Sequence, residues 1–171
     1  RIHQNGGPEQ MHWEEVTVGE PGPGEVLVRT RYCGICGSDL HYYHNGGFGP
    51  IKLREPMVLG HEVSGIIRAL GADTGDLLEG QLVAISPSRP CHSCAFCTKG
   101  QHNHCLNMRF YGSAMPFPHI QGAFSEQLVI SASQAILLAE AVLGQVSQHL
   151  KGGQKGRQGM SQALAESRFS G

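Results

Sequence analysis

The chain of 171 residues carries a formal net charge of −1, and its sequence pI is near 6.9. This near-neutral balance gives no reason to expect a nucleic acid or an anionic membrane as a partner, and no apolar stretch approaches the length that crosses a bilayer. The length fits one domain of ordinary size, or one domain with an extension.

Short β-strands are the secondary structure that the sequence favours. Glycine, at 24 residues, and proline, at 9, punctuate the chain as turns do between short strands. Apolar and polar residues alternate in three places, and the run Leu82–Ile85 is continuously apolar, as in a buried strand. The alternating sets are Val26, Val28, Thr30 and Tyr32; Val63, Gly65, Ile67 and Ala69; and Phe124, Leu128 and Ile130. We therefore expect a mainly β domain over residues 1–132 with a barrel core, because closure removes exposed strand edges.

A candidate catalytic metal site is formed by Cys36, His61 and Glu62, which offer one sulfur, one imidazole and one carboxylate. Three protein ligands leave a fourth zinc position for water or substrate, which distinguishes a catalytic site from a closed one. Neighbouring glycines suit tight turns that expose ligands at strand ends; they are Gly34, Gly37 and Gly60. The alternative is a small buried cysteine with a surface histidine–glutamate pair. Cys33, close to this set, is predicted to be a buried thiol.

A second metal site is predicted from Cys91, Cys94, Cys97 and Cys105, which are separated by two, two and seven residues. Four soft thiolates favour zinc, with an iron–sulfur centre as the lesser alternative. An all-cysteine shell has no open position, so this metal is expected to be structural, in a lobe spanning residues 88–110. Disulfides are the other alternative, but they need an oxidising compartment, and no apolar signal segment stands at the start of the chain. A cytoplasmic location is therefore expected.

The last part of the chain is predicted to be an amphipathic helix over residues 133–151 and a flexible tail over residues 152–171. Apolar residues recur every four positions, at Leu138, Val142, Val146 and Leu150. Ser133 is a plausible N-cap, and the tail is rich in Gly, Gln and Ser. No stretch matches the GxGxxG motif of a dinucleotide-binding Rossmann fold, so such a domain is expected to be absent from this chain.

Four segments taken together carry a family resemblance. They are GICGSDLHYY, PMVLGHEVSG, the four-cysteine segment and NMRFYGSAMPFPHIQGAF, and in this order they resemble the zinc-dependent medium-chain alcohol and polyol dehydrogenases over roughly residues 25–134. Residues 1–25 look more like the quinone oxidoreductase branch of the same superfamily, which lacks zinc. The resemblance implies a GroES-like catalytic domain, with the cofactor held by a separate Rossmann domain. This chain is therefore expected to be the catalytic half only, and to have little or no activity alone.

The resemblance also implies roles for individual residues. The implied catalytic zinc ligands are Cys36, His61 and Glu62, the implied proton relay is Ser38 and His41, and the implied substrate-pocket residue is Tyr42. The alternatives are a turn hydroxyl for Ser38, an exposed imidazole for His41, and a core tyrosine for Tyr42 or Tyr43. Glu140 is a second candidate for the third ligand, weakened because the proline that follows this glutamate in the family is absent here. Asp39 is expected to fix the turn geometry.

Two classes of function follow. The first is a zinc-dependent oxidoreductase that oxidises a secondary alcohol of a polyol or sugar acid, with L-idonate at C5 favoured. It would hold two zinc ions per chain and transfer hydride to NAD or NADP in the complete enzyme, for which an oligomer is one expected state. The second is a cofactor-free zinc-binding barrel module, or an inactive fragment. A small-molecule substrate is the expected partner. The scattered histidines His3, His12, His44 and His119 are expected on the solvated surface.

Overall fold

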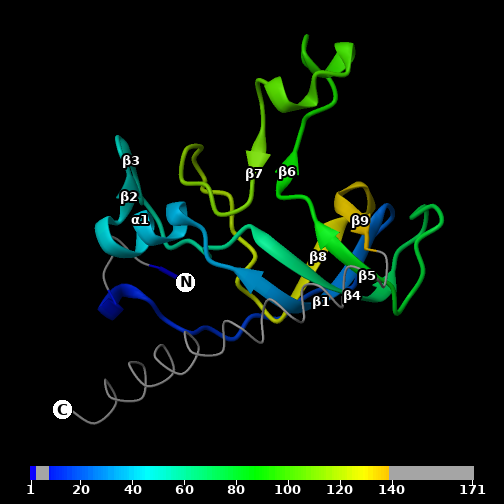
Figure 1. Cartoon of the computed structure of the whole chain (residues 1–171), viewed down its shortest axis with the longest axis horizontal. Coiled ribbons are helices and arrows are strands. Elements are labelled where there is room, and N and C mark those ends of the chain that lie inside the picture. The colour runs from blue at the N-terminus through cyan, green and yellow to red at the C-terminus, as the bar shows by residue number, and fades with distance from the viewer. Residues whose placement is uncertain (3–7, 139–171) are drawn as a thin grey trace. The chain divides into compact units, whose positions relative to one another are not determined.

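A five-stranded antiparallel sheet forms the main part of the protein (Figure 1). The computed structural model describes residues 1–2 and 8–138, nearly all of which belong to one compact unit, Arg1–Leu137. The hydrogen-bonded strand order is β8-β1-β4-β5-β9. The strands are β1 (Glu25–Gly34), β4 (Glu62–Leu70), β5 (Leu82–Ile85), β8 (Gln127–Ser131) and β9 (Ala135–Leu137). The predicted mainly β class is confirmed.

The two edge strands of this sheet are joined by a very short connection. β8 and β9 lie at opposite ends of the hydrogen-bonded order, yet only the 3-10 turn η4 (Ala132–Gln134) separates them in the chain. The sheet must therefore curl until its edges approach, as strands do in a barrel. The buried side chain of Gln134 holds this corner, because its Nε2 donates to the Ser86 carbonyl oxygen at 2.8 Å and its Oε1 accepts from the Ser131 N–H at 3.3 Å.

The inward face of the sheet carries the main hydrophobic core. Its fully buried members alternate along the strands as the sequence predicted; they include Val26, Val28, Ile67, Val83 and Ile130. The predicted strands at residues 26–32, 63–69 and 82–85 are confirmed. Two details differ. Leu82–Ile85 is buried only at alternate positions, because β5 lies within the sheet with one face inward. Phe124 precedes β8 and so lies outside that strand, which contains Leu128 and Ile130.

A second, smaller hydrophobic core surrounds the only α-helix of the described residues, α1 (Gly37–Asn45). It contains Ile2, Tyr42, Leu53, Met57, Leu59 and Ala114. Short strands β2 (Gly47–Phe48) and β3 (Ile51–Lys52) pair beside α1, and η1 (Pro8–Gln10) lies near the N-terminus. Backbone hydrogen bonds in both directions join Ile2 to Met57. Between Leu59 and Val63 the chain passes from this core to the sheet core.

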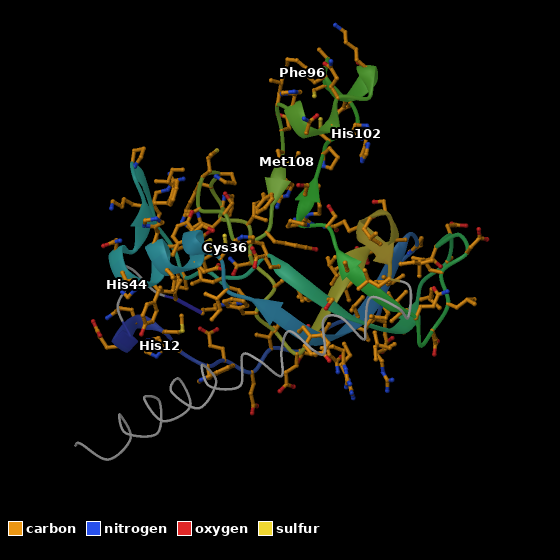
Figure 2. The ribbon with its side chains drawn as sticks, viewed as in Figure 1. His12, Cys36, His44, Phe96, His102 and Met108 are labelled. Atoms are coloured by element: carbon orange, nitrogen blue, oxygen red, sulfur yellow. The ribbon has the colours of Figure 1, made fainter. Side chains whose placement is uncertain are left out.

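A lobe projects from the sheet between β6 (Ser88–Arg89) and β7 (Arg109–Phe110), which pair side by side at its base (Figure 1). Its distal part contains two 3-10 turns, η2 (Cys97–Lys99) and η3 (His102–His104). Figure 2 shows Phe96 and His102 at this distal part, while Cys36 lies at the start of α1. The lobe therefore holds its cysteines away from the helix that carries the other candidate ligand.

Two sequence predictions about local structure are wrong. Residues 133–137 do not begin a helix. Ser133 lies inside η4, and Ala135–Leu137 form β9, because this segment finds a tertiary partner in β5. The remainder of the predicted helix, the tail 152–171 and Glu140 lie outside the described residues. None of the helices in the described part is long and apolar enough to cross a membrane.

The second wrong prediction concerns His119, which is 4% exposed. Its Nε2 accepts the Arg54 backbone N–H at 2.9 Å, and its Nδ1 lies 2.9 Å from the Pro116 carbonyl oxygen. Its own backbone N–H donates to Glu55. A neutral ring with its proton on Nδ1 satisfies both ring contacts, so His119 ties two loops together. His12 and His44 are exposed as expected (Figure 2), and His3 lies outside the described residues.

Candidate metal centres

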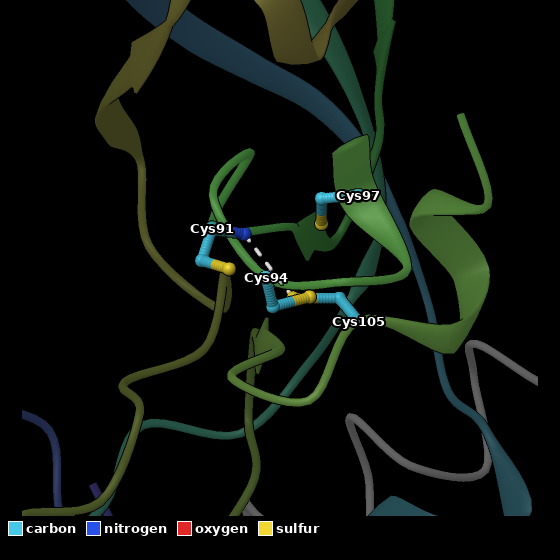
Figure 3. A group of neighbouring side chains, drawn as sticks. All are labelled: Cys91, Cys94, Cys97 and Cys105. Carbon is cyan, nitrogen blue, oxygen red and sulfur yellow. Dashed lines mark hydrogen bonds between the residues drawn. The ribbon is translucent and has the colours of Figure 1, made fainter. Parts of the chain in front are cut away.

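The four cysteines of the lobe gather around one point (Figure 3). Their sulfur atoms all lie within 4.8 Å of one another, which suits a single tetrahedral ion. The segment between Cys94 and Cys105 reverses at Gly100, which has a φ of 74° and donates its N–H to the Cys97 carbonyl oxygen at 3.0 Å. All four cysteines are free thiols, so the structure does not contain the alternative disulfides.

Hydrogen bonds prepare some of these sulfurs for a metal. The Cys91 N–H donates to Cys105 Sγ at 3.2 Å, and Asn107 Nδ2 donates to Cys91 Sγ at 3.6 Å. Hydrogen bonds from Ser93 and Asn107 lower the pKa of Cys91 to about 5, whereas burial raises the pKa of Cys97 to about 12. Without a metal, the cluster therefore contains both thiolate and thiol. A cation binding all four sulfurs must displace the Cys97 proton.

The second group consists of Cys36, His61 and Glu62, whose ligand atoms also lie within 4.8 Å of one another. Cys36 is the N-cap residue of α1, and Glu62 begins β4 with His61 immediately before it. Antiparallel pairing of β1 with β4 sets Gly34 opposite Glu62, which brings the two ligand-bearing segments together. The chain thus assembles a mixed sulfur, nitrogen and oxygen donor set from segments that are distant in sequence.

Two glycines leave room for this donor set. A Cβ atom on Gly34 would lie 2.3 Å from Glu62 Oε2, so a side chain there would displace the Glu62 carboxylate. Gly60 has a φ of 90°, and a Cβ atom there would lie 2.2 Å from the Phe124 ring. Backbone conformation and close approach therefore favour glycine at Gly60, whereas a side chain at Gly34 would require the Glu62 carboxylate to move.

Asp39 links the two segments. This carboxylate is 3% exposed; its Oδ2 accepts the Cys36 N–H and its Oδ1 accepts the Gly60 N–H, both at 2.9 Å. Asp39 Oδ1 is also 3.8 Å from His61 Nδ1, a contact too long for a good hydrogen bond. His61 Nδ1 is buried and has no hydrogen-bond partner among the described residues. An unsatisfied ring nitrogen within a cysteine and carboxylate donor set fits a zinc ligand or its orienting partner.

A cavity of about 180 Å³ lies against this group. Of the three candidate ligands, His61 lines it, and the Phe110 ring stands 5.4 Å from the His61 ring. Ser38, in the first turn of α1, and Tyr42, one turn further, line the same cavity. The Tyr42 hydroxyl accepts the Ala114 N–H at 3.2 Å and is buried in the small core, so Tyr42 is both a core residue and a cavity residue.

The other candidate residues lie outside the cavity. His41 is exposed and packs edge to face on Phe48, with ring centroids 4.9 Å apart. Tyr43 packs at the margin of the small core. Cys33 is exposed, so its prediction as a buried thiol is wrong, because residues alternate sides along β1 and this position faces outward. Partial enclosure and the nearby Asp39 charge still raise the pKa of Cys33.

Several cavity residues were given no role from sequence. They are Phe48, Ile51, Phe110, Gly112, Ser113 and Met115. Four of them belong to the segment MRFYGSAM, which contributed to the family resemblance but shows no periodic or ligand-type signal. Their position beside His61 depends on how β7 and the following loop fold back over α1. Sequence spacing alone does not contain that information.

Comparison with known proteins gives the family. The model of the alcohol dehydrogenase GroES-like domain matches residues 22–140, which is more than half of the chain. The chain belongs to the zinc-dependent medium-chain alcohol and polyol dehydrogenases. The resemblance stated from the four segments is thereby confirmed. The likeness of residues 1–25 to the quinone oxidoreductase branch stays a prediction.

Members of this family with assigned activities share substantial identity with the chain. The L-idonate 5-dehydrogenase (NAD(P)(+)) of Escherichia coli K12 is 48% identical over 111 residues, which are 65% of this chain and 32% of that protein. Human sorbitol dehydrogenase is 43% identical over 97 residues, covering 57% of this chain and 27% of that protein. The chain therefore spans about a third or less of the length of these relatives.

Solved structures agree with the sequence relatives. The crystal structure of L-idonate 5-dehydrogenase from Escherichia coli superposes with a TM-score of 0.64 at 46% identity, covering 68% of this chain and 33% of that one. A putative zinc-binding dehydrogenase from Sinorhizobium meliloti, bound to NADP, gives a TM-score of 0.61 at 34% identity, covering 72% of this chain and 34% of that one. The described unit thus has the fold of the corresponding part of these enzymes.

Proposed function

We propose that the chain provides the catalytic domain of a zinc-dependent oxidoreductase that oxidises a secondary alcohol of a polyol or sugar acid. The observation that carries this proposal is the group of Cys36, His61 and Glu62, with ligand atoms within 4.8 Å of one another beside a cavity that His61 lines. Three ligands leave a fourth position, and the cavity provides space for an alcohol at that position.

Cys36, His61 and Glu62 would hold the catalytic zinc, and the sealed cysteine cluster of the lobe would hold a structural one. Bound zinc supplies Lewis acidity that lowers the pKa of an alcohol hydroxyl. Glu62 is the third ligand in this proposal because its carboxylate lies in the group, whereas Glu140 lies outside the described residues. The structural site fits zinc because all four of its donors are sulfur.

The remaining residues of the site position groups and move a proton. Asp39 fixes the backbone at Cys36 and Gly60 through two 2.9 Å hydrogen bonds, so that the cysteine and histidine side chains start from fixed places. Ser38 lines the cavity, and in this proposal its hydroxyl accepts the proton of the substrate alcohol while it donates its own proton toward His41. His41 is exposed on the same helix, where its imidazole passes the proton to water. Phe110 and Met115 give the cavity an apolar wall.

L-idonate, oxidised at C5, is the substrate we propose, with NAD or NADP as hydride acceptor in the complete enzyme. Support comes from the name of the Escherichia coli relative, which gives both the substrate and the cofactor pair, and from the NADP-bound neighbour. Human sorbitol dehydrogenase and the xylulose reductases of Aspergillus niger are related at lower identity, which keeps the substrate within the polyol class. The expected cytoplasmic location and oligomeric state stay predictions.

A cofactor-free zinc protein is the second candidate, because both candidate metal centres form within the described residues of this chain. Titration of the zinc-loaded chain with NAD and NADP, followed by fluorescence or calorimetry, should give saturable binding only if the chain takes part in a cofactor site, and such binding would support the oxidoreductase. Absence of binding is expected of both functions when a separate domain holds the cofactor. The response of the Cys36 metal to the substrate, tested below, therefore separates the two functions.

Metal stoichiometry tests the catalytic site directly. Elemental analysis of the wild-type chain should find two zinc ions, and Cys36→Ser should retain one. Cys94→Ser should also lose one, and it identifies the structural site independently. Cobalt substitution of the Cys36 group should give a visible spectrum that shifts on addition of L-idonate. Hexanoate, which has the same carbon chain and carboxylate but no hydroxyl groups, should not shift it. A wild-type chain that binds only one zinc, retained in Cys36→Ser, would refute the proposed catalytic centre.

A further inference from the structure

Two arginines face each other at the base of the lobe. In the antiparallel pair of β6 and β7, Arg89 is directly opposite Arg109, and Ser88 is opposite Phe110. Opposite residues of such a pair lie on the same face, with Cβ atoms about 4.5–5.5 Å apart, and like charges there repel each other. Because successive residues alternate faces, the arginines lie on the side of the ribbon away from Phe110, which lines the cavity. This arginine pair is therefore separate from the Cys36, His61 and Glu62 group.

Arg89 is held in place rather than freely solvated. Its guanidinium carbon lies 5.2 Å from the centroid of the Tyr111 ring, and Tyr111 is buried in the sheet core. Arg89 Nε is buried and has no hydrogen-bond partner in the part of the chain that the structure describes. A buried guanidinium N–H without an acceptor costs free energy. The contact with the Tyr111 ring also restrains the guanidinium, so less conformational entropy is lost when an acceptor binds.

No carboxylate of the described residues neutralises this pair. The ion pairs found there join Arg1 to Glu14 and His61 to Asp39. Glu25 influences the same tyrosine, but its Oε2 accepts the Gly22 N–H at 3.0 Å. Two positive charges in register, neither of them in an ion pair within the described residues, therefore favour an anion with several oxygen acceptors.

We propose that Arg89 and Arg109 bind a phosphate group on the face of the β6–β7 pair that points away from the cavity. A phosphate dianion balances both guanidinium charges and offers three oxygens, so it can accept from the terminal nitrogens of Arg89 and of Arg109 together. A monocarboxylate balances only one charge. The phosphate is either free or part of a small phosphate ester, and both present the same oxygens. This site does not depend on the proposed oxidoreductase function.

The test is calorimetric titration of the zinc-loaded chain with inorganic phosphate at constant ionic strength in chloride. We expect saturable binding that Arg89→Gln and Arg109→Gln each weaken about tenfold or more, since each removes a charge-assisted contact. Arg29→Gln, an exposed arginine of β1, is the matched control and should bind phosphate as the wild type does. Glucose 6-phosphate in a parallel titration distinguishes the sources: tighter binding assigns an ester, and equal or weaker binding assigns free phosphate.

Three results would overturn the proposal. They are absence of phosphate binding, binding that neither arginine substitution weakens, and acetate binding as tightly as phosphate. Cys36→Ser tests whether phosphate binds instead to the metal at the Cys36 group. If this variant loses phosphate binding while the arginine variants retain it, phosphate does not bind at Arg89 and Arg109. Circular dichroism checks folding. If Arg89→Gln is unfolded, phosphate binding by Arg109→Gln alone decides the test, because Arg109 is exposed and its substitution removes no buried contact.

Discussion

Replacing Asp39 with asparagine substitutes an amide NH2 group for one carboxylate oxygen, at the place where the segments that carry Cys36 and His61 meet. Each Asp39 oxygen accepts one backbone N–H at 2.9 Å, from Cys36 and from Gly60, in a side chain that is 3% exposed. Asparagine offers one carbonyl oxygen, so its amide group must face the other N–H and leave that donor without an acceptor. A hydrogen bond to a charged group is worth about 1.5–3 kcal/mol, and we expect the free energy of unfolding to fall by about 2–3 kcal/mol.

The same substitution should weaken metal binding at the Cys36 group. Loss of a residue that orients metal ligands typically costs about 10- to 100-fold in metal affinity. Chelator competition should therefore show one weakened zinc in Asp39→Asn and an unchanged structural zinc, and urea denaturation of the metal-free chain measures the stability loss. Asp76→Asn, at an exposed position, is the control and should change neither quantity. An Asp39→Asn chain with wild-type stability and wild-type affinity for both zinc ions would refute the positioning role.

Three further predictions concern the space, the protonation and the core around these sites. Gly34→Ala should displace the Glu62 carboxylate, because that carboxylate lies 2.3 Å from the added Cβ. The variant should therefore bind one zinc more weakly in chelator competition. Gly37→Ala is the control and should bind both zinc ions as the wild type does, because nothing lies within 4 Å of its added Cβ. Zinc binding by the metal-free lobe at neutral pH should release the Cys97 proton, because its pKa is raised to about 12, while Cys91, with a pKa of about 5, has none to release. Zinc affinity of the lobe should therefore rise with pH, and calorimetry in buffers of different ionisation enthalpy counts the protons; zinc binding without proton release contradicts this assignment. Ile67→Ala, at a fully buried position, should lower the free energy of unfolding by about 2–5 kcal/mol, whereas Leu78→Ala, 63% exposed, should leave the urea midpoint nearly unchanged.

Local sequence patterns predicted the strands and the cysteine lobe well. Alternation located β1, β4 and β5 because one face of each strand is buried in the same core, and this burial imposes a period of two on the sequence. The cysteine lobe could be predicted from the sequence equally well. Cys91, Cys94 and Cys97 are close in sequence, so a single turn-rich segment can bring their sulfurs together without long-range contacts.

Long-range pairing decided the features that the sequence could not give. The apolar spacing after Ser133 suggested a helix, but Ala135–Leu137 pair with β5, and that tertiary pairing overrides local periodicity. His119 looked like a surface histidine because nothing near it in sequence reveals that Arg54 and Pro116 would satisfy both of its ring nitrogens. The cavity wall depends in the same way on a loop that returns to α1 from a distant part of the chain.

By itself, the amino-acid order determined which residue types were available for two metal centres and which segments would be strands. It determined the sulfur cluster almost completely, because that cluster is local. Only the tertiary structure decided that Cys36, His61 and Glu62 meet, since their approach requires the register of β1 against β4 and the two hydrogen bonds of Asp39. Only the fold, likewise, set Arg89 opposite Arg109, because strand register is a property of pairing and not of either segment alone.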